Sequence, residues 1–285
     1  MKTLKKAVKG VLPPSLLTRI LWKQGIRAGN FNLRLINHIV KPGMIIVDVG
    51  ASDGLFSARF LQLTGKAGHV YAVEPHPDNE ASLAPLHKRH PQFDYFMCAA
   101  SNVNAVSELH VPMANGVTHT GLSSLRSPSQ GDAIQEIVVE LKTLDSLLQD
   151  EERPISFIKI DVEGHELAVL KGAARVLASK PVLLIEIEQR HCDGSIVDTF
   201  DFLLNSGYDG WALFRNGLRP IERFNLERDQ TAFVDGRFQD VMPLSYVNDF
   251  LFVEKGKLPP TELMDRCPSD ASEPREGFNP PITEL

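Results

Sequence analysis

Two glycines and two aspartates follow a short apolar run in the first quarter of the chain. The segment "IIVDVGASDGLF" covers residues 45–56 and places Asp48, Gly50, Asp53 and Gly54 where a buried strand is expected to give way to a helix. Glycine lets the backbone approach a ligand closely, and aspartate supplies hydrogen-bond acceptors. Ligands of open α/β sheets bind beyond the carboxyl ends of the strands. The segment therefore predicts a ligand site at this turn.

A further acid lies at the end of the next expected strand. Glu74 closes the strand predicted at residues 69–74, in "AVEPHP". A carboxylate at this place suits the two hydroxyl groups of a ribose, which indicates an adenosine-containing cofactor. Simpler explanations exist for each acid alone, because Asp53 could cap the following helix and Glu74 could be a solvated strand end. Both acids and both glycines in one strand-turn-helix-strand unit favour the cofactor.

The same loop discriminates between cofactors. A dinucleotide-binding loop reads G-x-G-x-x-G and packs a pyrophosphate against the start of a helix. Residues 50–54 lack the middle glycine, and Asp53 would bring a negative charge toward the phosphates. S-adenosyl-L-methionine carries a sulfonium and an ammonium group and no phosphate, so acids in this loop favour its binding. The loop therefore indicates S-adenosyl-L-methionine in preference to NAD.

A series of motifs resembles the FkbM-type family of S-adenosylmethionine-dependent methyltransferases. In chain order these are "VDVGASDG", "AVEPHPDN", "TLDSLL", "FIKIDVEGHELAVLKGA" and "PVLLIEIE", spanning roughly residues 43–190, with an echo in "VNDFLFV". The family usually carries Asn where this chain has Ser52. The resemblance implies a three-layer α/β/α Rossmann-like fold with a mostly parallel seven-stranded sheet and an antiparallel last strand. It also implies methyl transfer to an oxygen of a small-molecule or glycan acceptor.

The resemblance also assigns roles to the cofactor side of the site. It implies that the loop holds the methionyl part, that Glu74 and the adjoining Pro75 lie at the ribose, and that Ala100 lies near adenine. The loop residues so assigned are Asp48, Gly50, Ser52, Asp53 and Gly54.

Further acids are concentrated at the next two buried strands. The run "FIKID" ends in Asp161, which we expect to face the ligand crevice because its strand lies next to the cofactor strand. Glu166, at the expected start of a helix, is more simply a favourable partner of the helix dipole. Glu186 and Glu188 interrupt a strand that should be apolar on both faces. At least one of them is expected to face the crevice or to pair with a buried cation.

Methylation of a hydroxyl requires removal of its proton. An alcohol resembles water, whose pKa is about 15.7, whereas an unperturbed histidine has a pKa of about 6.5. The base must therefore act while the C–O bond forms, unless a metal lowers the pKa of the alcohol. His191 is the first candidate, with Asp161 or Glu188 orienting it or the substrate. His165 is the rival and the weaker base, because a helix N-terminus disfavours its charged form. A metal held by Asp161 and Glu186 is the alternative, although no ligand spacing demands one.

Alternation of apolar runs with amphipathic stretches predicts a parallel sheet wrapped by helices from residue 43 onward. The last third reads as antiparallel, with a hairpin at the Asn-Gly turn of residues 216–217. We expect a methyltransferase domain at 43–255, a basic amphipathic extension at 1–42 and a disordered proline-rich tail at 256–285. The loop at 115–131, which contains His119, is expected to cover the acceptor side.

Charge and cysteine content exclude several classes of protein. The net charge of −6 argues against broad nucleic-acid binding, which needs a basic surface. Three cysteines without a CxxC spacing indicate neither a disulfide framework nor a thiolate zinc site, which fits a reducing cytoplasm. Residues 1–25 either dock on their own domain, the favoured interpretation, or touch the inner face of a membrane. A non-catalytic, methyltransferase-like scaffold is the alternative to an enzyme.

Overall fold

The computed structural model describes residues 31–114, 117–118, 123–125, 133–214, 217–233 and 246–259. The expectations for residues 1–25, for most of the loop at 115–131 with His119, and for the tail beyond residue 259 lie outside these ranges. No helix within the described ranges is long and apolar enough to cross a membrane.

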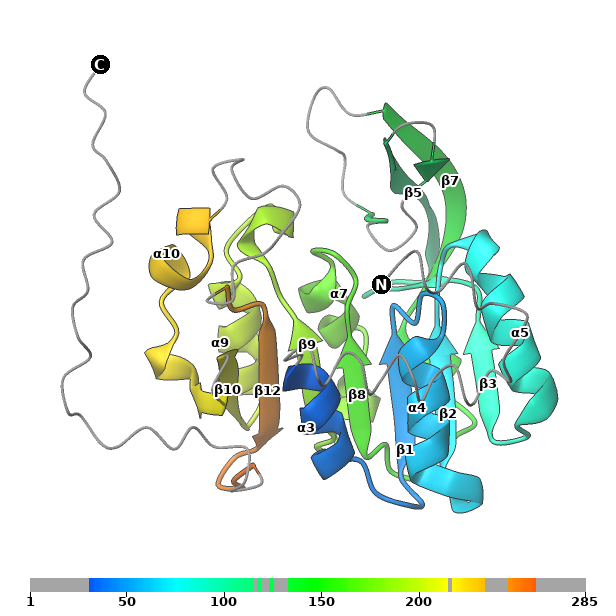
Figure 1. Ribbon diagram of the computed structural model, residues 1–285, viewed down its shortest axis with the longest axis horizontal. Helices are drawn as coiled ribbons and strands as arrows, with labels where there is room; N and C mark the ends of the chain where they lie inside the picture. The colour runs from blue at the N-terminus through cyan, green and yellow to red at the C-terminus, as the bar shows by residue number, and fades with distance from the viewer. Residues whose placement is uncertain are drawn as a thin grey trace.

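The main sheet has eight strands in the order β11-β10-β12-β9-β8-β1-β2-β3 (Figure 1). Strands β3, β2, β1, β8 and β9 are parallel, while β12 pairs antiparallel with both β9 and β10. This confirms the expected fold: β12 is the antiparallel last strand, and the hairpin strand β11 adds an eighth strand at the edge. The bounds are β1 Ile45–Val49, β2 His69–Val73, β3 Phe93–Phe96, β8 Phe157–Ile160, β9 Val182–Glu186, β10 Tyr208–Phe214, β11 Gly217–Pro220 and β12 Asp249–Glu254.

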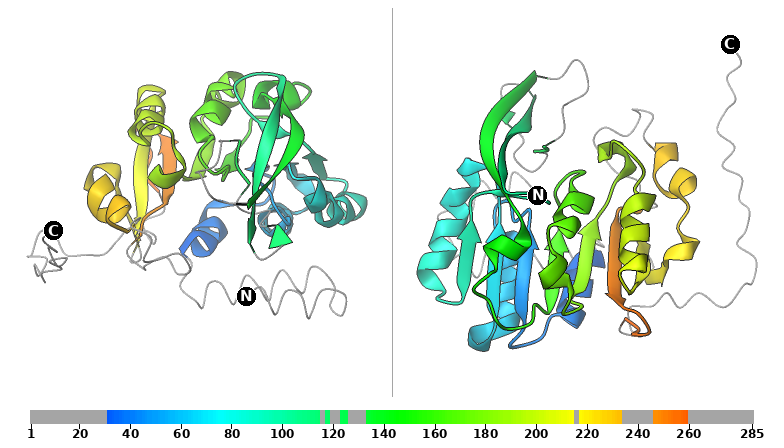
Figure 2. Two further views of the ribbon diagram at one scale, coloured as in Figure 1. Left: turned by 90° about the horizontal axis from the view of Figure 1, so that it is seen from above. Right: turned by 180° about the vertical axis from the view of Figure 1, so that it is seen from behind.

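Helices cover both faces of this sheet and make the three layers (Figure 2). One face packs against α3 (Phe31–Ile39), α4 (Leu55–Thr64) and α5 (Glu80–Arg89). The other face packs against α6 (Leu144–Leu147), α7 (Glu166–Lys171), α8 (Ala174–Leu177) and α9 (Val197–Asn205). Central strands are therefore buried on both sides, which explains their continuous apolar runs. Helix α3, in the expected N-terminal extension, buries Leu35 and Ile36 completely.

A smaller sheet was not expected from the sequence. It has the order β4-β7-β5-β6, with β4 Ala99–Ala100, β5 Ala105–Ala114, β6 Val117–Thr118 and β7 Ala133–Lys142. Strands β5 and β7 form an antiparallel ribbon that stands above the carboxyl ends of the main strands (Figure 1). The alternation in these segments was recognisable, but their pairing with each other was not.

The aromatic side chains of β12 anchor the antiparallel part of the sheet. Phe250 is fully buried, and its ring centroid lies 4.8 Å from that of Phe200 in α9 and 5.1 Å from that of Phe224. Such ring contacts add to the stabilisation that comes from burial alone.

We expect Phe250→Ala to lower the free energy of unfolding by about 3–5 kcal/mol, because it leaves a cavity among these rings. Val106→Ala is the control, since Val106 is 68% exposed on the ribbon and its truncation should change stability by less than about 0.5 kcal/mol. Urea denaturation followed by circular dichroism measures both. Similar losses for the two variants would contradict the position of Phe250 in the core.

Candidate active site

A cavity of about 260 Å³ lies at the carboxyl ends of β1, β2 and β8, beneath the ribbon. Leu109, Ser123 and Leu125 close it from the ribbon side. The sequence-predicted residues that line it are Gly50, Ser52, Asp53, Glu74, Pro75, Ala100, Asp161 and His165. Three others, Asp48, Gly54 and His191, are not part of its lining. The structure thus brings most of the expected cofactor residues together.

The loop after β1 passes unusually close to the end of β8. Gly50 has φ +76°, and a Cβ atom at this position would lie 1.8 Å from the carbonyl oxygen of Asp161. Its amide donates to the carbonyl of Val73 at 2.9 Å, which ties the loop to β2 as well. Gly54 also has a positive φ and begins α4 against Leu83. The glycines therefore allow the loop to pack closely against other parts of the protein. This close packing places the loop beside the cavity.

Glu74 is a buried carboxylate that the loop holds in place. The amide of Ser52 donates to its Oε2 at 2.8 Å, and the amide of His76 and Nδ2 of Asn79 donate to its Oε1 at 2.8 and 3.0 Å. Burial raises the pKa of Glu74, while these hydrogen bonds counteract the rise. Among the described residues, Oε2 accepts this single bond, so the carboxylate retains an acceptor position for a ligand hydroxyl.

A buried lysine at the cavity interacts with two aspartates. Asp48 is fully buried and accepts a hydrogen bond from Ser57 Oγ at 2.6 Å, so it supports the loop from beneath. Lys159 lines the cavity and donates to Asp161 Oδ2 at 3.0 Å. Burial disfavours the charged lysine, but Asp161 and Asp48 outweigh it and raise the pKa of Lys159. Burial also raises the pKa of Asp48. A lysine in an apolar strand was a signal in "FIKID" that the sequence analysis did not use.

His165 lines the cavity in a buried setting. Its Nε2 lies 2.9 Å from Ser101 Oγ, and burial lowers its pKa. Burial therefore favours the neutral imidazole, whereas the cause expected from the sequence was the helix N-terminus.

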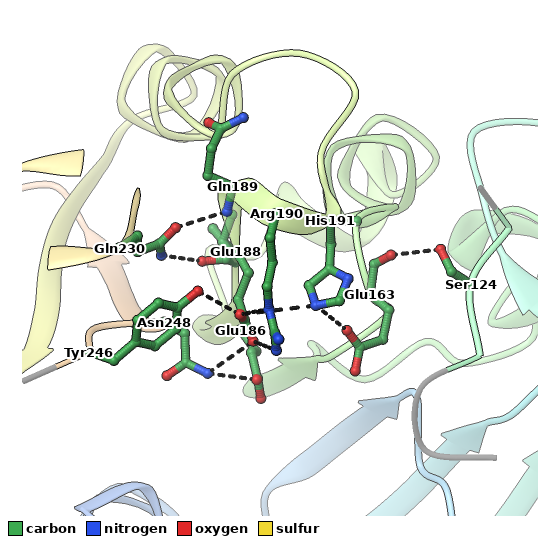
Figure 3. Close-up of polar contacts among 12 residues, drawn as sticks. Ser124, Glu163, Glu186, Glu188, Gln189, Arg190, His191, Gln230, Tyr246 and Asn248 are labelled. Atoms are coloured by element: carbon green, nitrogen blue, oxygen red, sulfur yellow. Dashed lines mark hydrogen bonds and ion pairs between the residues drawn. The ribbon is translucent and has the colours of Figure 1, made fainter. Parts of the chain in front are cut away.

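His191 does not line the cavity but contacts Glu163, which does (Figure 3). It lies in the short turn η4 (Gln189–His191), and its Nε2 is 3.1 Å from Oε2 of Glu163 and 4.0 Å from Oε2 of Glu188. Glu163, which does line the cavity, was not among the candidate residues predicted from the sequence. Burial raises its pKa to about 8, with the Asp161 and Glu188 carboxylates adding to the rise.

Glu186, the last residue of β9, and Glu188, just beyond it, are both held by hydrogen bonds. Glu188 accepts bonds from Arg190 and from Tyr246 Oη, the latter at 2.6 Å (Figure 3). Burial favours the neutral form of Glu188, but these donors prevail and its pKa lies below the ordinary value. Glu186 accepts from Asn248 Nδ2 at 2.7 Å, and burial raises its pKa well above the ordinary value. One of these acids was expected to face the crevice or to pair with a buried cation; Glu188 does pair with a cation, but its partner Arg190 is exposed. In the part of the chain that the structure describes, no group of three His, Cys, Asp or Glu side chains could hold a metal ion.

Comparison with known proteins identifies the family. The family model described as the methyltransferase FkbM domain matches residues 48–209, which is more than half of the chain. The chain belongs to this family. This confirms the resemblance seen in its motifs.

Two characterised relatives share part of the chain. The hexuronic acid methyltransferase AglP of Haloferax volcanii is 25% identical over 177 residues, which cover 59% of this chain and 66% of the relative. The chain thus spans just under two thirds of that relative's length. The 2-O-methyltransferase NoeI of Sinorhizobium fredii is 29% identical over 181 residues, 57% of this chain and 72% of the relative.

Solved structures resemble the chain at lower identity. An FkbM methyltransferase from Methylobacillus flagellatus is 17% identical with a TM-score of 0.45, covering 87% of this chain and 57% of that one. Aeropyrum pernix fibrillarin in complex with S-adenosyl-L-methionine is 12% identical, also with a TM-score of 0.45, covering 80% of this chain and 73% of that one.

The close approach of the loop to β8 can be tested with two glycines. Gly50 and Gly43 both have a positive φ, so alanine should cost roughly 1–2 kcal/mol of stability at either position from backbone strain alone. A Cβ at Gly43 would meet nothing within 4 Å, whereas at Gly50 it would strike the carbonyl of Asp161. We therefore expect Gly50→Ala to destabilise the protein clearly more than Gly43→Ala in thermal denaturation. Equal losses would contradict the close approach.

Proposed function

We propose that the chain transfers a methyl group from S-adenosyl-L-methionine to a hydroxyl oxygen of a sugar or glycan. The observation that carries the proposal is the position of Glu74: a buried carboxylate at the end of β2 that faces the cavity with an acceptor position left. This is where an open α/β sheet of this kind holds a ribose.

The cavity walls fit the remaining parts of this cofactor. Pro75, Ala99 and Ala100 supply a small apolar surface suited to the adenine ring. Asp53 and Asp161, on the loop and on β8, suit the positively charged methionyl end. Lys159 is the cation among the described lining residues, and it is engaged with Asp161. These residues therefore offer little positive charge to bind a pyrophosphate, which disfavours NAD.

The chain's own residues mainly orient the acceptor and exclude water from the reacting groups. When bound, S-adenosyl-L-methionine supplies an electrophilic methyl group on a sulfonium. Phe56, Leu109 and Leu125 present apolar side chains to the cavity, so they exclude water from the reacting groups. Of the predicted catalytic residues, Asp161 and His165 contact this space directly, and they are placed to orient an acceptor. His191 acts through Glu163.

The acceptor class draws its support from the two relatives. One is named a hexuronic acid methyltransferase and the other a 2-O-methyltransferase. A hydroxyl acceptor is also consistent with a cavity that carries several carboxyl groups, since these accept hydrogen bonds from sugar hydroxyls.

Isothermal titration calorimetry with S-adenosylhomocysteine tests the cofactor assignment. We expect wild type to bind, and Glu74→Gln to bind at least about tenfold more weakly because the charged acceptor is lost. Glu80→Gln removes the same charge from the exposed start of α5 and should bind like wild type. Absence of binding to wild type, or equal affinity in Glu74→Gln, would refute the assignment.

The acceptor is tested by incubating the enzyme with radiolabelled S-adenosyl-L-methionine and the methyl glycosides of glucose, fucose and glucuronic acid. Incorporation of label into a glycoside, with a methyl ether located by mass spectrometry, is the expected result. Absence of label from all three glycosides would contradict a sugar acceptor and would leave the cofactor assignment unchanged.

A further inference from the structure

We propose that Glu163 is the catalytic residue that takes the proton from the acceptor hydroxyl, and that His191 positions it. The inference rests on the proposed function and assigns a role that the sequence analysis had given to His191. It follows from which of the two side chains reaches the cavity.

The first argument is the location of Glu163 along the sheet. Glu74 lies at the end of β2 and the glycine loop follows β1, so a nucleoside held there directs its reactive end toward β8. Asp161 and Glu163 follow β8 on this side of the cavity. The acceptor must approach from the side opposite the nucleoside, which places its hydroxyl next to these acids.

The second argument is the order of the contacts. Glu163 lines the cavity, whereas His191 does not and instead lies 3.1 Å behind it, measured from Nε2 to Oε2 (Figure 3). His191 in turn approaches Glu188, which Arg190 and Tyr246 hold in place. A proton that leaves the cavity therefore binds first to Glu163 and then to His191.

The third argument is the backbone of Glu163. Its φ of +53° is a conformation that non-glycine residues rarely adopt and that costs energy unless the surroundings enforce it. Ser124 Oγ donates to its carbonyl oxygen at 2.8 Å, and Ser124 also pairs with His110 of the ribbon. The ribbon thus holds this turn where the side chain is directed at the cavity wall. Backbone strain of this kind is concentrated at functional sites.

The charges around Glu163 suit a base. The acids that face it are Asp161, Glu166 and Glu188. The groups that carry or can take up a positive charge beside it are Arg190 and His191. Burial first, and then these acids, raise the pKa of Glu163 to about 8. A general base is most effective when its pKa lies near the working pH, and ordinary carboxylates are too weak. The Glu163 carboxylate and the His191 imidazole lie close enough for their titrations to be coupled.

Asp161 and His165, which also line the cavity near Glu163, are less suitable. Asp161 is already engaged by the Lys159 ammonium, whose Nζ lies 3.0 Å from Oδ2. His165 is bonded to Ser101 in a buried position that lowers its pKa. Both can orient the acceptor, but neither matches Glu163 as a proton acceptor.

The step balances as follows. The acceptor oxygen forms a bond to the methyl carbon while its hydroxyl proton moves to the Glu163 carboxylate. The bond between methyl carbon and sulfur breaks, and its electron pair stays on the sulfur. The sulfonium becomes a neutral thioether, the acceptor becomes a methyl ether, and Glu163 becomes a neutral acid that passes its proton to His191.

The protonation of the pair can be measured without an acceptor. In protein labelled with 13C at the glutamate carboxyl carbons, the resonance missing from Glu163→Gln identifies Glu163. We expect this carboxyl to titrate near pH 8, well above an ordinary glutamate, and to titrate at higher pH in His191→Gln. A titration midpoint near pH 4.5, or a midpoint that His191→Gln does not shift, would overturn the proposal.

Kinetics test the catalytic role with the three methyl glycosides as acceptors. The wild-type rate should rise with pH and level off above about 8, because the base must be deprotonated. Glu163→Gln should lower kcat by about 10²–10⁴-fold and flatten this profile, with an S-adenosylhomocysteine affinity within about twofold of wild type. Glu163→Asp should restore part of the rate. His191→Gln should move the midpoint of the profile.

Glu166→Gln is the matched control. Glu166 is also a buried acid, with a pKa raised by burial to about 7, but it is not part of the cavity lining. Its acceptor bond from the Gly164 amide survives in glutamine, so the variant should keep the wild-type kcat. Its pH profile should keep its shape and move only slightly to lower pH, because Glu166 is one of the acids that raise the pKa of Glu163. A wild-type kcat and profile in Glu163→Gln would overturn the proposal. If no glycoside is methylated, the sugar acceptor fails and the carboxyl titration decides the role of Glu163.

Discussion

The contact between the loop after β1 and the end of β8 is the constraint on which the rest of the site depends. The Asp161 amide donates to the carbonyl of Val49 at 3.0 Å, and Gly50 then turns so tightly against Asp161 that no side chain fits. This contact aligns the ends of β1 and β8, and the bond from Gly50 to Val73 adds β2. Carboxylates from three neighbouring strand ends therefore meet around one cavity.

Such a concentration of acids is unfavourable unless each has a partner. Asp48 is bonded by Ser57, Glu74 by three donors, Asp161 by Lys159, and Glu188 by Arg190 and Tyr246. Among the described residues of this network, the Glu163 carboxylate has a histidine as its one contact, and burial raises its pKa to about 8. The partners make the surrounding acids structural and cofactor-binding groups, and they leave Glu163 as the group that exchanges a proton.

The sequence predicted the features that depend on short segments. Apolar runs located the strands, and the glycines and acids of residues 45–56 and 74 located the cavity, because these signals act within one strand-turn-helix unit. The ribbon was missed because the pairing of β5 with β7 depends on contacts across a long insertion. His191 was chosen on residue type, and Glu163 was not among the candidate bases. A carboxyl is a weak base until burial and neighbouring acids raise its pKa, and neither can be read from the local sequence.

The central claim is that the cavity between Glu74 and Glu163 holds the nucleoside and its reactive end. A crystal structure of the protein with S-adenosylhomocysteine tests it most directly. We expect a ribose hydroxyl within hydrogen-bond distance of Oε2 of Glu74, with the sulfur on the side of Asp161 and Glu163. A nucleoside bound elsewhere, or seated here with its ribose away from Glu74, would contradict the account.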